Sequence, residues 1–241
     1  MFNRVEILGV KVDALTMQQA VNRVESLIDA RVPSIVATAN AEMLLNSTHD
    51  AELKRILNSA ELVVPDGAGT VWAAHHLGFE MPERVAGFDL VQELMKISPQ
   101  KGRKFFLFGS APGIADKAKA KAEELYPGIK IVGTRNGYFT EKDEPEIILQ
   151  IKKAAPDILL AALGVPKQEK WLAAHKDELQ IPVSIGVGGT FDVMAGAVKR
   201  APVWMQKAKL EWLFRAMLQP SRAGRLVALP KFVFKVHASK K

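Results

Sequence analysis

Residues 157–164, DILLAALG, form an almost uninterrupted apolar run that ends at a glycine. A strand with one face in water alternates apolar and polar residues, whereas a parallel strand that helices cover on both faces is apolar throughout. Similar runs occur at 61–66 (ELVVPD), 103–110 (RKFFLFGS) and 183–189 (VSIGVGG). The pattern therefore predicts a parallel sheet whose two faces are both buried.

Amphipathic stretches separate these runs along the chain. Further strands are predicted at 4–10, 34–40 and 129–134, and helical spacing of apolar residues occurs at 16–30 and 166–179. Alternation of strands and helices is typical of the α/β class. We predict a Rossmann-like, mostly parallel sheet with helices on both faces, and a ligand site at the carboxyl ends of its strands.

Composition narrows the possible functions of the 241 residues. Apolar residues make up 48% and charged residues 24%, as in an ordinary globular protein. The absence of cysteine excludes disulfides, a thiolate nucleophile and zinc sites with sulfur ligands, and it fits a reducing compartment. Residues 1–14 carry charges in place of an apolar core, so we expect no signal peptide, no membrane-spanning segment and a cytoplasmic location.

Charge is distributed unevenly. Residues 199–241 hold eleven lysines and arginines against one acid, whereas residues 1–198 hold 22 bases and 25 acids. We therefore divide the chain into an α/β catalytic domain, 1–198, and a basic C-terminal appendage, 199–241. In 203–219 one narrow stripe of residues four apart, Lys207, Glu211, Arg215 and Gln219, lies on a largely apolar helix, which favours binding to an anionic membrane surface.

The sequence of the appendage allows two other interpretations. It is also compatible with a core helix of the same domain. Nucleic-acid binding is disfavoured because the basic residues alternate with large aliphatic side chains that prefer hydrocarbon. An apolar tail of this kind is further compatible with self-association into a homo-oligomer.

Polar and glycine-rich segments follow the predicted strands. Thr38 and Asn40 close the second strand, and Asp66 follows the third. Further along come GSAPG (109–113), GTRNGYF (133–139), LGVPKQEKW (163–171) and GVGGTFDVMAG (186–196). Each segment alone is compatible with a loop that needs glycine for a positive φ, or with a helix cap. Together they predict a ligand site along one rim of the sheet.

Several common chemistries lack their motifs. GSAPG is neither a P-loop nor a dinucleotide fingerprint, and no G-x-S-x-G segment supports serine hydrolysis. The five histidines show no H-x-x-x-H spacing, so no metal site is predicted. In GVGGTFD, glycines such as Gly188 and Gly189 would let backbone amides approach a diphosphate, and Asp192 would accept from a sugar hydroxyl or a base.

Asp66 is the carboxylate best placed to act as a general base. It ends a buried strand, and Arg84 lies about one helix further along the chain. One base beside cationic groups suits transfer from a nucleotide-activated donor, because the arginines offset the charge on the departing diphosphate. Asp66 is also the predicted cap of a helix starting at Gly67. Because capping bonds lower the pKa of a carboxylate, we expect backbone amides not to saturate its oxygens.

These motifs together resemble the WecG/TagA/CpsF glycosyltransferases. The segments that carry the resemblance are TAN (38–40), PDGAG (65–69), RVAGFDL (84–90), GYF (137–139), LGVPKQE (163–169), GVGGTFDVMAG (186–196), RAPVW (200–204) and LEWLFRAMLQPSRAGR (210–225). They keep the family's order and span nearly the whole chain.

The resemblance implies a reaction in wall teichoic acid linkage-unit synthesis. N-acetylmannosamine (ManNAc) would pass from UDP-ManNAc to the 4-hydroxyl of undecaprenyl-diphosphate-linked N-acetylglucosamine (GlcNAc), with inversion. No metal and no other cofactor would be needed. The enzyme would act as a peripheral protein on the inner face of the bacterial cell membrane.

The resemblance also assigns roles to single residues. Asp66 would be the base, with Thr38 and Asn40 beside it. Arg84 and Gln168 would lie around the sugar and diphosphate, and Tyr138 and Asp192 near the nucleotide. The C-terminal arginines would close over the diphosphates, and they are Arg215, Arg222 and Arg225. The roles of Arg135 and Asn136 stay open, because the residues before GYF vary.

Two alternatives remain at this stage. A relative that uses the uronate form of the donor, UDP-ManNAc-uronate, would need an additional cation facing the sugar carboxylate. A non-catalytic, membrane-docked module that senses nucleotide sugars would bind UDP without turnover and would not need Asp66.

Overall fold

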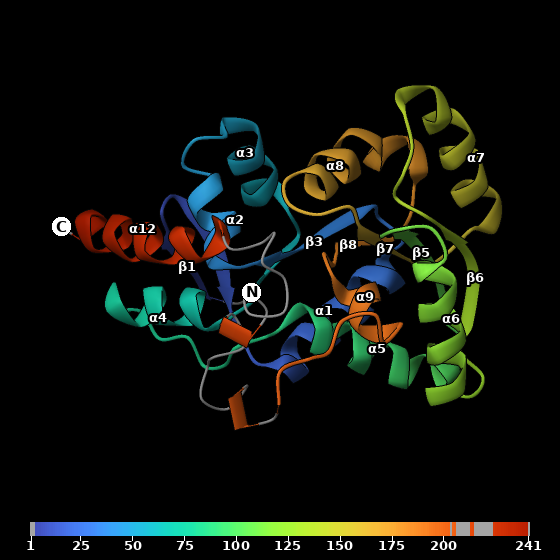
Figure 1. Cartoon of the computed structure of the whole chain (residues 1–241), viewed down its shortest axis with the longest axis horizontal. Coiled ribbons are helices and arrows are strands. Elements are labelled where there is room, and N and C mark those ends of the chain that lie inside the picture. Colours follow the sequence, from blue (N-terminus) through green and yellow to red (C-terminus); the bar gives the residue numbers. More distant parts are fainter. Residues whose placement is uncertain (1–2, 203, 206–212, 215–223, 241) are drawn as a thin grey trace.

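A six-stranded parallel sheet forms the centre of the molecule (Figure 1). The computed structural model describes residues 3–202, 204, 205, 213, 214 and 224–240, and for 224–227 it describes the backbone alone. The sheet strands are β3 (Ser34–Ala39), β4 (Leu62–Pro65), β5 (Lys104–Gly109), β6 (Lys130–Arg135), β7 (Ile158–Ala162) and β8 (Val183–Gly186). Their order across the sheet is β4-β3-β8-β7-β5-β6. The predicted Rossmann-like parallel sheet is confirmed.

Helices cover both faces of this sheet (Figure 1). One face packs against α2 (Ala41–Asn46), α3 (Ala51–Ser59), α4 (Ala68–His76), α7 (Glu144–Ala154) and α8 (Lys167–Leu179). The other packs against α1 (Met17–Ala30), α5 (Gly87–Lys101), α6 (Ile114–Leu125) and α9 (Thr190–Met194). A short 3-10 turn, Glu141–Asp143, precedes α7.

The apolar runs supply side chains to both layers. In β5, Phe106 and Phe108 enter one core, whereas Phe105 and Leu107 enter the other, and all four are fully buried. Successive side chains of a strand point to opposite faces, so a strand between two helical layers must be apolar at every position. This requirement explains why the runs do not alternate.

The first predicted strand, 4–10, is wrong in extent. The chain instead forms a hairpin of β1 (Asn3–Ile7) and β2 (Val10–Ala14), outside the main sheet. Leu8 and Gly9 make the turn, with φ of 52° and 80°. Two-residue hairpin turns need such left-handed conformations. Leucine rarely adopts them, so the sequence did not indicate a turn at Leu8. The hairpin lies against the edge strand β4, where Asp13 accepts a hydrogen bond from the Val63 amide at 2.8 Å.

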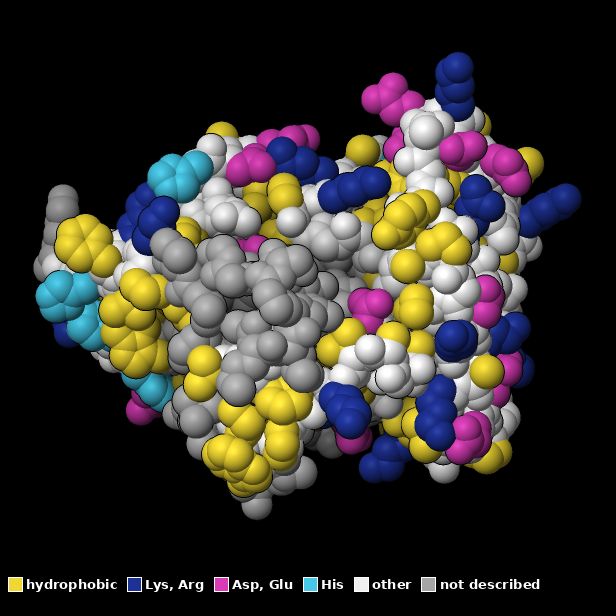
Figure 2. Space-filling view, in the orientation of Figure 1, with side chains coloured by type: hydrophobic (Ala, Val, Ile, Leu, Met, Phe, Trp, Pro, Cys, Tyr) yellow, Lys and Arg dark blue, Asp and Glu magenta, His cyan; other side chains and the backbone are white. Residues whose placement is uncertain are grey.

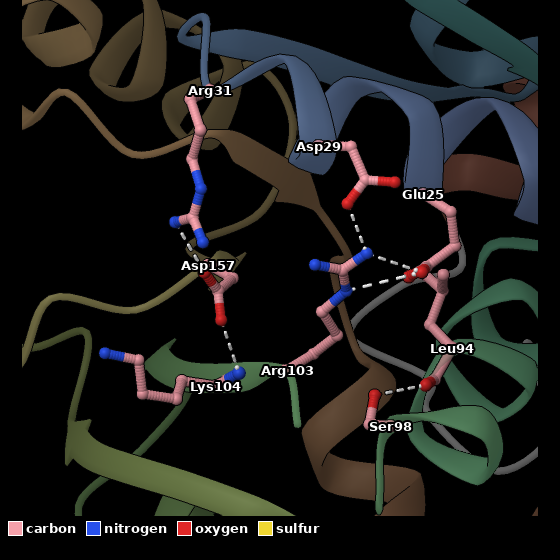
Figure 3. Close-up of polar contacts among 8 residues, drawn as sticks. All are labelled: Glu25, Asp29, Arg31, Leu94, Ser98, Arg103, Lys104 and Asp157. Atoms are coloured by element: carbon pink, nitrogen blue, oxygen red, sulfur yellow. Dashed lines mark hydrogen bonds and ion pairs between the residues drawn. The ribbon is translucent and has the colours of Figure 1, made fainter. Parts of the chain in front are cut away.

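Charged side chains join the elements at the amino ends of β5 and β7 (Figure 3). Asp157 accepts from the Arg31 guanidinium at 2.8 Å and from the Lys104 amide at 2.9 Å. Arg103 donates to Glu25 at 2.8 Å and to Asp29 at 2.6 Å. These charges pair with one another, so this end of the sheet is tied together by ion pairs.

The described part of the C-terminal appendage packs onto the body. Helix α12 (Gly224–Ser239) contacts α2 and α4, and its Phe232 and Val236 are fully buried. Arg200 makes a two-pronged ion pair with Asp89 of α5, at 2.7 and 2.8 Å. Helix α12 thus shares the core of the α/β body, as in the core-helix interpretation. The division at 198/199 itself stays a prediction.

Candidate active site

The strand order brings the predicted site residues to one edge of the sheet. Strand β3 lies between β4 and β8, so the chain segments that follow these three strands are neighbours. They contain Asn40, Asp66 and the loop 186–189. Next along the same edge come the ends of β7, β5 and β6, which lead to Gln168, Ser110 and Tyr138.

Asp66 is partly buried just beyond β4. Its amide donates to the Ala39 carbonyl at 3.0 Å, which ties the end of β4 to the end of β3. The Thr70 hydroxyl of α4 donates to the carbonyls of Asp66 and Ala39, at 3.1 and 2.8 Å. These bonds fix the backbone that carries the carboxylate.

The predicted helix cap is displaced by one residue. Helix α4 begins at Ala68, and Gly67 occupies the N-cap position with φ of 84°. Only glycine adopts this conformation readily, so the cap position excludes other residues. Asp66 therefore precedes the N-cap residue, and the prediction that it occupies the N-cap position is wrong. The further expectation, that backbone amides leave its oxygens unsaturated, stays a prediction.

The segment that carries Arg84 crosses the same strand ends. The amide of Val85 donates to the Pro65 carbonyl at 3.1 Å, so Arg84 and Asp66 adjoin a hydrogen-bonded pair of residues. Two residues further, Gly87 packs on Thr38, and a Cβ built on it would lie 2.8 Å from the threonine methyl. The turn into α5 therefore needs a glycine at position 87 for its close approach to Thr38 of β3.

Thr38 and Asn40 hold neighbouring backbone. The buried Thr38 hydroxyl donates to the Gly186 carbonyl at 3.0 Å, which links β3 to the end of β8. The Asn40 side chain accepts from the Met43 amide at 2.9 Å and caps α2. Both residues thus shape the rim around Asp66, and their contact with a substrate stays a prediction.

Gln168 is a buried side chain that joins two loops of the site. It is only 1% exposed, and its carbonyl oxygen accepts from the amides of Gly164 and Gly188, at 3.2 and 3.0 Å. Because the Gly188 amide is already bonded to Gln168, it is not free to bind a diphosphate in this conformation. Gly189 ends the loop as the N-cap of α9.

Glu169 is a residue that the sequence analysis did not single out. Its side chain is 1% exposed, and one carboxylate oxygen accepts from the Gln168 amide nitrogen at 2.7 Å. Burial raises the pKa of this carboxyl to about 7. A glutamate in the first turn of an amphipathic helix predicts exposure, so only the acid's place within LGVPKQE offered any signal.

The nucleotide-side candidates lie further along the edge. Tyr138 is 72% exposed, and its amide donates to the Asn136 side chain at 3.0 Å, which gives Asn136 a turn-forming role. The next residue, Phe139, stacks near Phe108, and the Lys167 ammonium lies 4.3 Å from its ring centre. Asp192 lies in α9, which packs against α6. The contact between Lys167 and Phe139 anchors the Tyr138 turn to the start of α8.

The predicted C-terminal arginines lie outside what can be described. Arg215 and Arg222 are not among the described residues, and of Arg225 only the backbone in α12 is. Their predicted role is therefore untested. Within the described ranges, no three His, Cys, Asp or Glu side chains gather as metal ligands. Nor does any helix of those ranges have the length and apolarity needed to cross a bilayer.

The chain is similar to known proteins along nearly its whole length. The model of the glycosyl transferase WecG/TagA/CpsF family matches residues 5–241. Two N-acetylglucosaminyldiphosphoundecaprenol N-acetyl-beta-D-mannosaminyltransferases of Staphylococcus aureus, from strains NCTC 8325 / PS 47 and MRSA252, are each 34% identical to the chain. Each alignment covers 99% of this chain and 94% of the relative. The chain belongs to the WecG/TagA/CpsF family of glycosyltransferases.

Proposed function

We propose that the enzyme transfers ManNAc from UDP-ManNAc to the 4-hydroxyl of GlcNAc-diphospho-undecaprenol, with inversion and without a metal ion. The names of the Staphylococcus aureus relatives, which denote a ManNAc transferase acting on this lipid-linked sugar, support the acceptor and the transferred sugar. The donor, the stereochemistry and the independence from metal are inferred from the site and from the family resemblance.

The observation that carries the proposal is the junction of β3, β4 and the Arg84 segment. Asp66 stands there on a backbone that is hydrogen-bonded to Ala39, next to Pro65, which binds the Arg84 segment. In the proposed step the acceptor hydroxyl attacks the anomeric carbon and gives its proton to Asp66. The bond from that carbon to UDP breaks, and arginines offset the charge of the departing diphosphate.

The length of the rim suits an extended donor. Asp66 and Tyr138 follow the two edge strands of the sheet, β4 and β6. Five strand spacings separate β4 from β6, or roughly 24 Å along the edge, and the Tyr138 turn folds back over the end of β5, where the Gly137 amide donates to the Ser110 carbonyl at 2.8 Å. We place the sugar at the Asp66 end and the nucleotide toward Asp192 and Tyr138, with the loop 186–189 between them.

The exposed face of α12 supports binding to a membrane surface. At the end of the molecule formed by α4 and α12, Figure 2 shows hydrophobic side chains beside histidines and lysines. Phe234 is 76% exposed there, and Lys231, Lys235 and Lys240 lie on the same helix or just beyond it. Aromatic and basic groups together favour an anionic lipid surface. We propose peripheral binding to the inner face of the cell membrane, where the acceptor resides.

A donor panel tests the proposal. The purified enzyme is given a short-chain lipid diphosphate–GlcNAc acceptor with UDP-ManNAc, UDP-GlcNAc or UDP-ManNAc-uronate, and UDP release is followed. We expect turnover with UDP-ManNAc and little with the other two. Preference for the uronate would identify a different donor, and UDP binding without any turnover would identify a sensor.

A further inference from the structure

The hydrogen bonds of Gln168 fix the orientation of its side-chain amide. Its oxygen accepts from two backbone amides, those of Gly164 and Gly188. If the amide were rotated by half a turn, its NH₂ group would face these two N–H donors and no bond could form. Glu169 prevents that rotation, because its carboxylate accepts from the Gln168 NH₂ group at 2.7 Å.

The Gln168–Glu169 pair is pressed against the end of β8. A Cβ built on Gly186 would lie 2.7 Å from the Gln168 amide nitrogen and 2.9 Å from the Glu169 carboxylate oxygen. Real Cβ atoms do not come so close to other atoms, so any side chain at position 186 would displace the ends of the Gln168 and Glu169 side chains. The Gly186 carbonyl in turn accepts a hydrogen bond from the Thr38 hydroxyl of β3. Gly186 therefore connects the Gln168–Glu169 pair to the strand that ends just before Asn40.

Burial of the Glu169 carboxylate destabilises the folded state. It is 1% exposed, and its second carboxylate oxygen is buried without a hydrogen-bond partner among the described residues. Buried carboxylates without full hydrogen bonding destabilise the folded state. A leucine would fill a similar volume without that cost, so stability does not explain the glutamate.

We propose that Glu169 is a positioning residue that acts through Gln168. By fixing the direction of the Gln168 amide, it holds the loops at Gly164 and Gly188 in the shape that receives the nucleotide diphosphate of the donor. The inference rests on the proposed function only in taking a UDP-sugar as the donor.

Four variants and one control test it in the full-length enzyme. Glu169→Gln keeps an acceptor for the Gln168 NH₂ group, whereas Glu169→Leu removes it and fills the space. Gln168→Ala and the double variant Gln168→Ala/Glu169→Leu show whether Glu169 acts through Gln168. Glu178→Leu, on an exposed position of the same helix, is the matched control. UDP affinity is measured by titration calorimetry, and Tm by thermal unfolding.

The expected pattern separates positioning from stability. Loss of one buried acceptor makes Glu169→Leu bind UDP about tenfold more weakly, while its Tm stays equal or rises. Glu169→Gln binds within about twofold of the wild type, since the hydrogen bond survives. In the Gln168→Ala background, Glu169→Leu has no additional effect, because residues that act as one unit are not additive.

Four results would overturn the inference. They are unchanged UDP binding in Glu169→Leu, equal weakening in Glu169→Gln, an additive effect in the double variant, and failure of Glu169→Leu to fold. The proposed function fails separately, in the wild type. If the wild type binds UDP but does not use UDP-ManNAc, the donor assignment is wrong, and the UDP titrations still decide the role of Glu169.

Discussion

Phe232 and Phe234 lie two residues apart on α12 and face opposite directions. Phe232 is fully buried, and its ring approaches Gly69 of α4, where an added Cβ would lie 3.8 Å away. Phe234 is 76% exposed. One face of the helix therefore completes the core over α2 and α4, and the other is available to an external surface.

This pair allows stability and membrane binding to be separated. Phe232→Ala should lower the free energy of unfolding by about 3–5 kcal/mol, the usual cost of emptying a buried phenylalanine site. Phe234→Ser should change it by less than about 0.5 kcal/mol, yet weaken sedimentation with vesicles that contain anionic lipid. Urea unfolding and vesicle sedimentation measure the two effects. Undiminished vesicle binding by Phe234→Ser would show that α12 is not the membrane contact.

Asp66→Asn tests the proposed base. The amide keeps the size of the carboxylate but cannot accept the proton, so turnover should fall about 10²–10⁴-fold. UDP affinity and Tm should stay near the wild-type values. Asp177→Asn, at an exposed position of α8, is the control for a lost surface charge. Turnover of Asp66→Asn close to that of the control would remove Asp66 from the mechanism.

The raised pKa of Glu169 predicts how stability depends on pH. The folded protein binds the proton of this carboxyl more tightly than the unfolded chain does, because burial raises the pKa from 4.5 to about 7. The folded state is therefore most stable relative to the unfolded chain below pH 4.5, where this carboxyl is protonated in both, and that stability is lost as the pH rises from 4.5 through about 7. A shift of this size corresponds to about 3 kcal/mol.

Glu169→Gln removes this titration. The difference in unfolding free energy between the variant and the wild type should grow in favour of the variant between pH 4.5 and 7.5. Urea unfolding at four or five pH values measures that difference. A constant difference across this range would mean that Glu169 titrates as an ordinary exposed acid.

Independence from metal is a further testable expectation. Arginines and helix amides are proposed to offset the charge of the leaving diphosphate. Turnover should then survive dialysis against EDTA and should not rise when Mg²⁺ or Mn²⁺ is added back. Loss of activity in EDTA that either ion restores would reveal a metal site that the proposal lacks.

The sequence predicted the sheet well because its signal is local. A buried parallel strand such as 157–164 must be apolar at every position, and β7 (Ile158–Ala162) lies within it. The hairpin at Leu8 and Gly9 was missed for the opposite reason. Its turn depends on backbone angles that leucine adopts only where the packing of β2 on β4 compensates for them.

The site residues divide in the same way. The places of Asp66, Asn40 and Thr38 at one edge of the sheet were predictable, because each lies in the last turn of a recognisable strand or just beyond it, whereas their roles stay predictions. The burial of Glu169 could not be predicted from the sequence. Gly186, which packs against its carboxylate, belongs to β8, and β8 follows α8 in the chain. This burial is a property of the assembled sheet, and no pattern within α8 indicates it.

The position of β8 has a consequence for synthesis of the chain on the ribosome. Thr38 and Gly186, which are hydrogen-bonded across β3 and β8, are 148 residues apart in the sequence. Until β8 emerges, β3 has a partner on one side only, so nascent chains present an unpaired, apolar strand edge. Such edges pair readily with other chains, and contacts between distant residues form slowly. Chains that stop short of residue 183 should therefore aggregate rather than fold into smaller, partly active forms.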